Sequence, residues 1–148
     1  MPTTTEQTTL LNSLLRGEMS AIETYRQALD KLKGSTEPGV TELQTMQRDH
    51  RDAADALWHH MERKGKQPSE GSGAWGAFAK AVEGTAKLFG NTAALKALKE
   101  GEEHGLKEYK DAIEDDSCTP ELKTLLRGFM SRQQAHIQTL DRLMATRP

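Results

Sequence analysis

An acidic residue, Glu102, lies in the middle of a run of apolar residues that are spaced as one face of a helix. The stripe advances by steps of three or four residues and consists of Leu95, Leu98, Glu102, Leu106 (with Gly105), Tyr109 and Ile113. This spacing predicts a buried helical seam with a carboxylate inside it. A buried carboxylate is unfavourable unless a proton, a cation or several hydrogen bonds compensate its charge. The rest of the chain should therefore supply such partners.

Three further seams carry polar residues, and together the four seams contain an internal repeat. The repeat has a Gly-Glu pair, a Tyr seven residues after the Glu, and a later Gln-x-x-His. Its two copies are Gly17-Glu18, Tyr25, Gln47 and His50, and Gly101-Glu102, Tyr109, Gln133 and His136. A self-match at fixed spacing predicts two related helical hairpins.

Each Glu should lie opposite the His of its own copy. In an antiparallel hairpin, residues equidistant from the turn face each other. The midpoints of the two Glu–His pairs are Gly34 for Glu18 and His50, and Thr119 for Glu102 and His136. Both midpoints fall in stretches rich in Gly, Pro, Ser and Thr, which favour turns. The sequence therefore predicts one layer of Glu and His side chains across a helical bundle.

The elements that position this layer are predicted to be all helical. Ala, Leu, Glu, Lys and Gln dominate the chain, and β-branched runs are absent. We expect a single domain over residues 1–148, with helices at about 5–33, 38–64, 92–115 and 120–146. Residues 65–91 are too many for a turn between antiparallel neighbours. They predict a crossover with a short helix at about 74–88, so that the second and third helices run parallel.

Composition limits the partners and the compartment that we expect. The 148 residues carry a net charge of −2, which gives no basic surface for nucleic acid or an anionic membrane. The single Cys118 fits a reducing compartment, and neither a signal peptide nor a transmembrane stretch is visible, so we expect a cytoplasmic protein. The apolar face that includes Trp75 and Phe78 should cover a bundle end or a second copy in a homodimer or higher oligomer.

Two hairpins, a long crossover and inward-facing Glu and His resemble the ferritin-like superfamily, and most closely a group of small uncharacterised bacterial four-helix-bundle proteins. The resemblance implies a ferritin-like bundle, in which such side chains hold a di-iron or di-manganese centre. It also implies that Glu18 and Glu102 match the terminal carboxylates and that His50 and His136 match the imidazoles. Where the family has bridging Glu residues, this chain has Gln47 and Gln133. A neutral amide seldom bridges two cations, so a dinuclear oxidase is disfavoured.

Three interpretations of the layer follow. In the first, Glu18, His50, Glu102 and His136 bind a single divalent ion such as Zn, Fe(II), Mn or Ni, with Gln47 or Gln133 as a weak ligand. In the second, the layer is a metal-free hydrogen-bonded clasp that fixes helix register in a structural or partner-binding bundle. In the third, Glu23 or Glu103 completes a dinuclear redox centre. Tyr25 and Tyr109 are expected either to donate hydrogen bonds into the layer or to pack as ordinary aromatic residues. The sequence identifies no catalytic residue.

Overall fold

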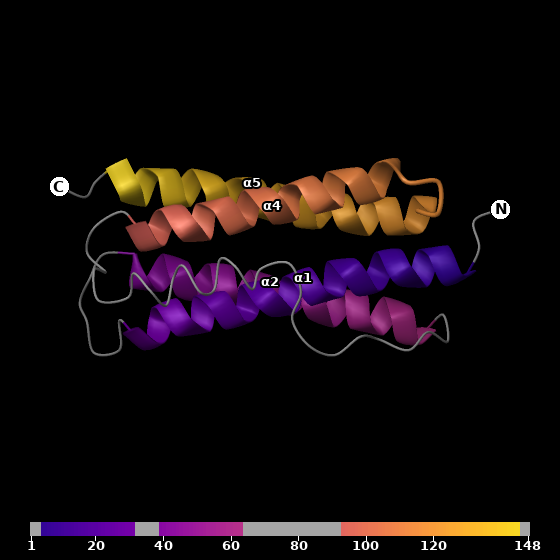
Figure 1. The fold of residues 1–148 in the computed structure, drawn as a ribbon, viewed down its shortest axis with the longest axis horizontal. Coiled ribbons are helices and arrows are strands. Elements are labelled where there is room, and N and C mark those ends of the chain that lie inside the picture. The colour runs from indigo at the N-terminus through magenta and orange to yellow at the C-terminus, as the bar shows by residue number, and fades with distance from the viewer. Residues whose placement is uncertain (1–3, 32–38, 64–92, 146–148) are drawn as a thin grey trace.

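The computed structural model describes residues 4–31, 39–63 and 93–145, and these form four α-helices (Figure 1). The helices are α1 (Thr4–Lys31), α2 (Val40–Arg63), α4 (Ala93–Glu114) and α5 (Pro120–Ala145). The predicted all-α four-helix bundle is confirmed, and each described helix overlaps one of the four predicted ranges. The predicted crossover, its short helix at about 74–88 and the apolar face on that helix lie outside the described residues. None of the described helices is long and apolar enough to cross a lipid bilayer.

The four helices pack as two antiparallel hairpins. α1 packs along α2, and α4 packs along α5, while α1 and α4 form the main contact between the hairpins. α1 and α5 run towards one end of the bundle, whereas α2 and α4 run towards the other (Figure 1). α2 and α5 close the bundle on the side opposite the α1–α4 contact, and they contact each other less than α1 and α4 do.

Local sequence explains where two of the helices begin. The amide of Leu122 donates a 3.2 Å hydrogen bond to the Thr119 hydroxyl, so Thr119 is the N-cap of α5. α2 begins after Gly39, whose φ of 102° is a conformation that favours glycine. A Cβ at Gly39 would also lie 3.2 Å from the Leu143 side chain of α5. Gly39 therefore allows both the turn into α2 and the close approach of α5.

The core consists of two apolar clusters on either side of a polar layer. One cluster includes Leu15, Leu57, Tyr109 and Leu126. The other includes Tyr25, Leu43, Leu98 and Leu140. Along every helix, a buried polar residue stands between the members of one cluster and those of the other, and these residues are Glu18, His50, Glu102, Gln133 and His136. The expected layer of Glu and His is thus enclosed by apolar packing, which excludes water and strengthens its electrostatic interactions.

Candidate metal centre

Glu102 on α4 is the centre of the polar layer. Its side chain is fully buried, and three groups converge on its Oε2 atom. The Tyr25 hydroxyl donates to it over 2.6 Å, while His50 Nε2 lies 2.8 Å and His136 Nδ1 3.0 Å away. The other oxygen, Oε1, has no hydrogen-bond partner among the described residues. One carboxylate oxygen is therefore the meeting point of two imidazoles that come from α2 and α5.

Each of these imidazoles has a second carboxylate on its far nitrogen. His50 Nδ1 lies 2.7 Å from Glu18 Oε2, and His136 Nε2 lies 2.8 Å from Asp49 Oδ2. The result is a continuous chain of side chains, in the order Glu18, His50, Glu102, His136 and Asp49. A metal-binding histidine commonly has a carboxylate on its outer nitrogen, because the carboxylate fixes the tautomer and the ring orientation.

The two tyrosines of the repeat cross between the hairpins. Tyr25 on α1 hydrogen-bonds Glu102 on α4, and Tyr109 on α4 donates over 2.7 Å to Glu18 Oε1 on α1. Both rings are buried. Burial and the neighbouring carboxylate charges raise the pKa of both hydroxyls well above their ordinary value, so the tyrosines stay protonated donors. Of the two roles expected for these residues, donation into the layer is the one that the structure has.

The charges of the layer stabilise one another. Burial alone would lower the pKa of His50, but the charges of Glu102 and Glu18 and the hydrogen bonds to them raise it well above its ordinary value. Burial alone would raise the pKa of Glu102, but the charge of His50 and the hydrogen bonds from His136 and His50 lower it to about 2. In the metal-free protein at neutral pH, Glu102 is therefore an ionised carboxylate and His50 is a positively charged imidazolium.

The two glutamines of the repeat lie in different places. Gln47 is half-buried and donates a 3.1 Å hydrogen bond to the backbone carbonyl of Ile22. Gln133 is buried, and its Nε2 lies so close over Gly105 that a Cβ there would be 2.6 Å from it. Its carbonyl oxygen has no hydrogen-bond partner among the described residues.

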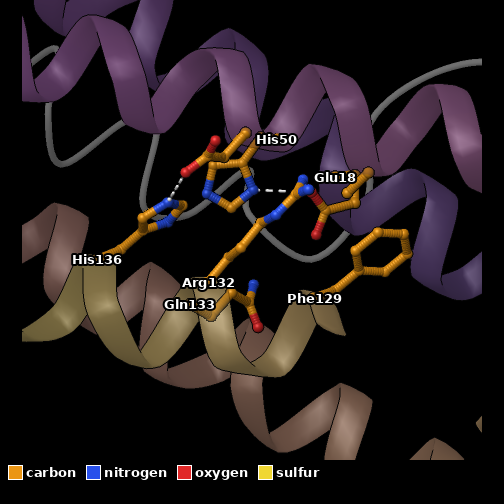
Figure 2. A pocket seen from close by; sticks show the side chains of 8 residues that line it. Glu18, His50, Phe129, Arg132, Gln133 and His136 are labelled. Atoms are coloured by element: carbon orange, nitrogen blue, oxygen red, sulfur yellow. Dashed lines mark hydrogen bonds and ion pairs between the residues drawn. The ribbon is translucent and has the colours of Figure 1, made fainter. Parts of the chain in front are cut away.

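A small cavity lies beside the layer. Its volume is about 10 Å³, which is close to the least that holds one water-sized species. His50 extends from α2 towards this space, and His136 and Gln133 extend from α5 (Figure 2). Glu18, Asp49 and Arg132 also line it. We name it the inner cavity.

The donor set fits a metal ion. His50, Glu102 and His136 each offer one ligand atom, and these atoms lie within 4.8 Å of one another. All three residues are buried. Two imidazoles and one carboxylate are a ligand set that several first-row metal ions accept, including iron and zinc. Glu18, which we expected among the ligands, contacts His50 from outside this group.

Sequence reasoning did not identify Asp49. Asp49 precedes His50 and is therefore displaced from the apolar seam of α2, and its side chain is 29% exposed. Only the packing of α5 beside α2 shows that it reaches His136. A signal did exist, because histidines that bind metals commonly have a carboxylate partner on the other ring nitrogen. Asp49 is the acid next in sequence to the candidate ligand His50.

The acids required for the dinuclear interpretation are not at the layer. Glu23 pairs with Arg26 on the exposed face of α1. Glu103 lines a groove on the outer surface of α4 and α5. Neither residue lines the inner cavity or belongs to the group that could hold a metal ion.

Comparisons with known proteins give a family. Residues 6–115, more than half of the chain, match the family model described as "Domain of unknown function (DUF2383)". The match includes Glu18, His50 and Glu102 but ends before α5, which carries His136. No curated protein and no solved structure matches the chain. The chain belongs to the DUF2383 family.

Proposed function

We propose that this protein binds a single divalent metal ion in its core through His50, Glu102 and His136. The observation that carries the proposal is the convergence of His50 Nε2 and His136 Nδ1 on Glu102 Oε2, over 2.8 and 3.0 Å. A cation between these atoms would replace the protons that now hold them together. It would also compensate the charge of a carboxylate with no exposed surface.

The surrounding residues support this proposal. Glu18 and Asp49 lie on the outer nitrogens of the two imidazoles and orient them. Tyr25 donates to Glu102 and holds its carboxylate in place. Gln133 offers a buried carbonyl oxygen at the inner cavity and is a candidate for a further weak ligand. The ligand types suit Fe(II), Mn(II) or Zn(II).

A second candidate function is a metal-free clasp that fixes the register of the helices. The observation in its favour is that every ring nitrogen of His50 and His136 has a carboxylate oxygen within 3.0 Å. Both imidazoles then have hydrogen-bond partners on each ring nitrogen without a metal ion. Such a network would specify one arrangement of the two hairpins in a structural or partner-binding protein.

Elemental analysis separates the two functions. The chain is purified without a histidine tag and reconstituted with Fe(II), Mn(II) or Zn(II). About one retained equivalent is expected for a mononuclear site. This metal should be lost in His136→Gln and retained in His59→Gln, because His59 is an exposed residue of α2 away from the layer.

Each other outcome contradicts the proposal in a distinct way. Retention of no metal by the folded wild type would leave the clasp as the function. Retention by His136→Gln at the wild-type level would place the metal elsewhere. About two equivalents would indicate a dinuclear centre despite Gln47 and Gln133.

A further inference from the structure

A second cavity, which we name the outer cleft, opens between α2 and α5. Its volume is about 250 Å³. Its walls include Glu42, Thr45 and Asp49 from α2, and Ala135, His136 and Thr139 from α5. Thr45 and Ala135 are exposed, so the cleft is accessible from the surface of the described helices. It lies along the α2–α5 pair, where the two hairpins contact each other less than along α1 and α4.

The outer cleft and the inner cavity share two residues, Asp49 and His136. The 2.8 Å contact between Asp49 Oδ2 and His136 Nε2 therefore borders both of them. The Asp49 side chain is 29% exposed, and that of His136 only 5%. Asp49 thus touches solvent on one side and a candidate ligand on the other.

The outer cleft and the inner cavity differ in the charges of the residues that line them. Among the described residues that line the outer cleft, the residues with formal charge are Glu42 and Asp49, and no Lys or Arg is present. The inner cavity has in addition a cation, Arg132, which extends from α5 along it (Figure 2). A cleft lined by one sign of charge concentrates counter-ions, whereas a guanidinium repels a second cation.

We propose that divalent cations enter and leave the core through the outer cleft, with the Asp49–His136 pair as the gate. This inference rests on the proposed metal site. Asp49 offers the first oxygen ligand to an arriving cation, and its rotation away from His136 opens the inner cavity. Glu42 raises the local concentration of cations at the mouth, and the same path serves release.

Stopped-flow mixing with Co(II) tests the route, because the visible absorbance of the bound ion reports binding directly. Release is measured by capture with excess chelator, and affinity by titration. Ala135→Trp fills the mouth of the cleft without removing a ligand. We expect it to slow uptake and release together by about tenfold or more while the equilibrium affinity stays unchanged. The matched control is Gln138→Trp, because Gln138 is an exposed residue of α5 that lines a groove on another face.

Further variants test the route even if Ala135→Trp does not fold. Thr45→Trp should act as Ala135→Trp does, from the opposite wall of the cleft. Glu42→Gln should slow uptake by about twofold to tenfold at low salt, and this difference should vanish at high salt. Arg132→Gln should not slow uptake.

The outcomes distinguish the route from the site. Uptake at the wild-type rate in folded Ala135→Trp and Thr45→Trp would overturn the route alone. Equal slowing in Gln138→Trp would overturn it as well. Failure of the wild type to take up Co(II), Zn(II) or Fe(II) would overturn the metal site and the route together.

Discussion

Tyr25 on α1 donates a 2.6 Å hydrogen bond to Glu102 on α4, and this bond crosses from one helical hairpin to the other. Tyr109 makes the reciprocal bond to Glu18. Each Tyr stands seven residues after the Glu of its own copy but serves the Glu of the other copy. The two bonds therefore link the hairpins at the level of the polar layer, in addition to the apolar contacts above and below it.

Loss of the Tyr25 hydroxyl should destabilise the bundle. In Tyr25→Phe, the buried carboxylate of Glu102 loses a donor while the aromatic packing stays. A hydrogen bond to a charged group contributes about 1.5–3 kcal/mol, and we expect a loss of that size in the free energy of unfolding. Urea unfolding of the metal-free protein measures it. Tyr109→Phe should behave alike because it removes the reciprocal bond. A loss below about 0.5 kcal/mol in both variants would show that these bonds do not hold the hairpins together.

The polar layer could be predicted from the sequence because two local properties determine it. Helical periodicity places Glu18, His50, Glu102 and His136 on buried seams. Equal distances from the turns then place each Glu beside a His. The contact between His50 and Glu18 within one hairpin agrees with this reasoning, as does the contact between His136 and Glu102 within the other.

Contacts between the hairpins could not be predicted in the same way. The hydrogen bond from Tyr25 to Glu102 and the contact between Asp49 and His136 both join one hairpin to the other. They depend on how the two hairpins dock, which neither helical periodicity nor the position of the turns determines. The ferritin-like relationship and the common origin of the hairpins stay predictions.

The stability of the metal-free protein should pass through a maximum in mildly acidic solution. The pKa of Glu102 is lowered in the folded state to about 2, so its contribution is present above its ordinary value of 4.5 and is lost as the pH falls towards 2. The pKa of His50 is raised above its ordinary value of 6.5. Its contribution is complete below 6.5 and is lost as the pH rises through the folded-state value. Together, these two groups stabilise the folded state most between pH 4.5 and pH 6.5.

Urea unfolding in the presence of a chelator, from about pH 3 to about pH 9, measures this profile. His50→Gln should reduce the loss of stability on the alkaline side of this profile, because a neutral amide does not titrate. His59→Gln is the control, since its ring is exposed and lies outside the layer. A stability that rises steadily from pH 6.5 towards alkaline pH would contradict the assigned protonation of His50.

Asp49→Asn should weaken metal binding without removing a ligand. Asp49 accepts from the outer nitrogen of His136, and an amide there no longer favours one orientation and tautomer of the ring. Loss of such a partner typically lowers metal affinity by about 10–100-fold. Competition with a chelator of known affinity measures the change. The matched control is Asp52→Asn, because Asp52 is an exposed acid of the same helix outside the cavity lining. Equal affinities for the wild type and Asp49→Asn would exclude a role for Asp49 in orienting His136.

The difference between Gln133 and Gln47 comes from one residue on the facing helix. Glu102 is followed three residues later by Gly105, whereas Glu18 is followed three residues later by Ala21. Gln133 occupies the space that a Cβ at Gly105 would take. At the corresponding place Ala21 has a Cβ, and Gln47 instead donates to the backbone carbonyl of the next residue, Ile22. A glycine in one copy of the repeat thus admits a glutamine to the inner cavity.

Gly105→Ala should therefore make the second copy resemble the first. The new Cβ would displace the Gln133 amide, and we expect its Nε2 to bond the carbonyl of Leu106, as Gln47 bonds that of Ile22. Gly128→Ala is the control, because a Cβ there meets nothing within 4 Å. Replacement of a mid-helix glycine by alanine should stabilise the control by about 0.5–1 kcal/mol.

In Gly105→Ala, the displacement of a buried amide should offset that gain, so that this variant unfolds at least about 1 kcal/mol more easily than Gly128→Ala. Urea unfolding of both variants measures the difference, and a crystal structure of Gly105→Ala locates the Gln133 amide. Equal stabilisation of the two variants, with Gln133 still at the inner cavity, would mean that the glycine does not determine where the glutamine lies.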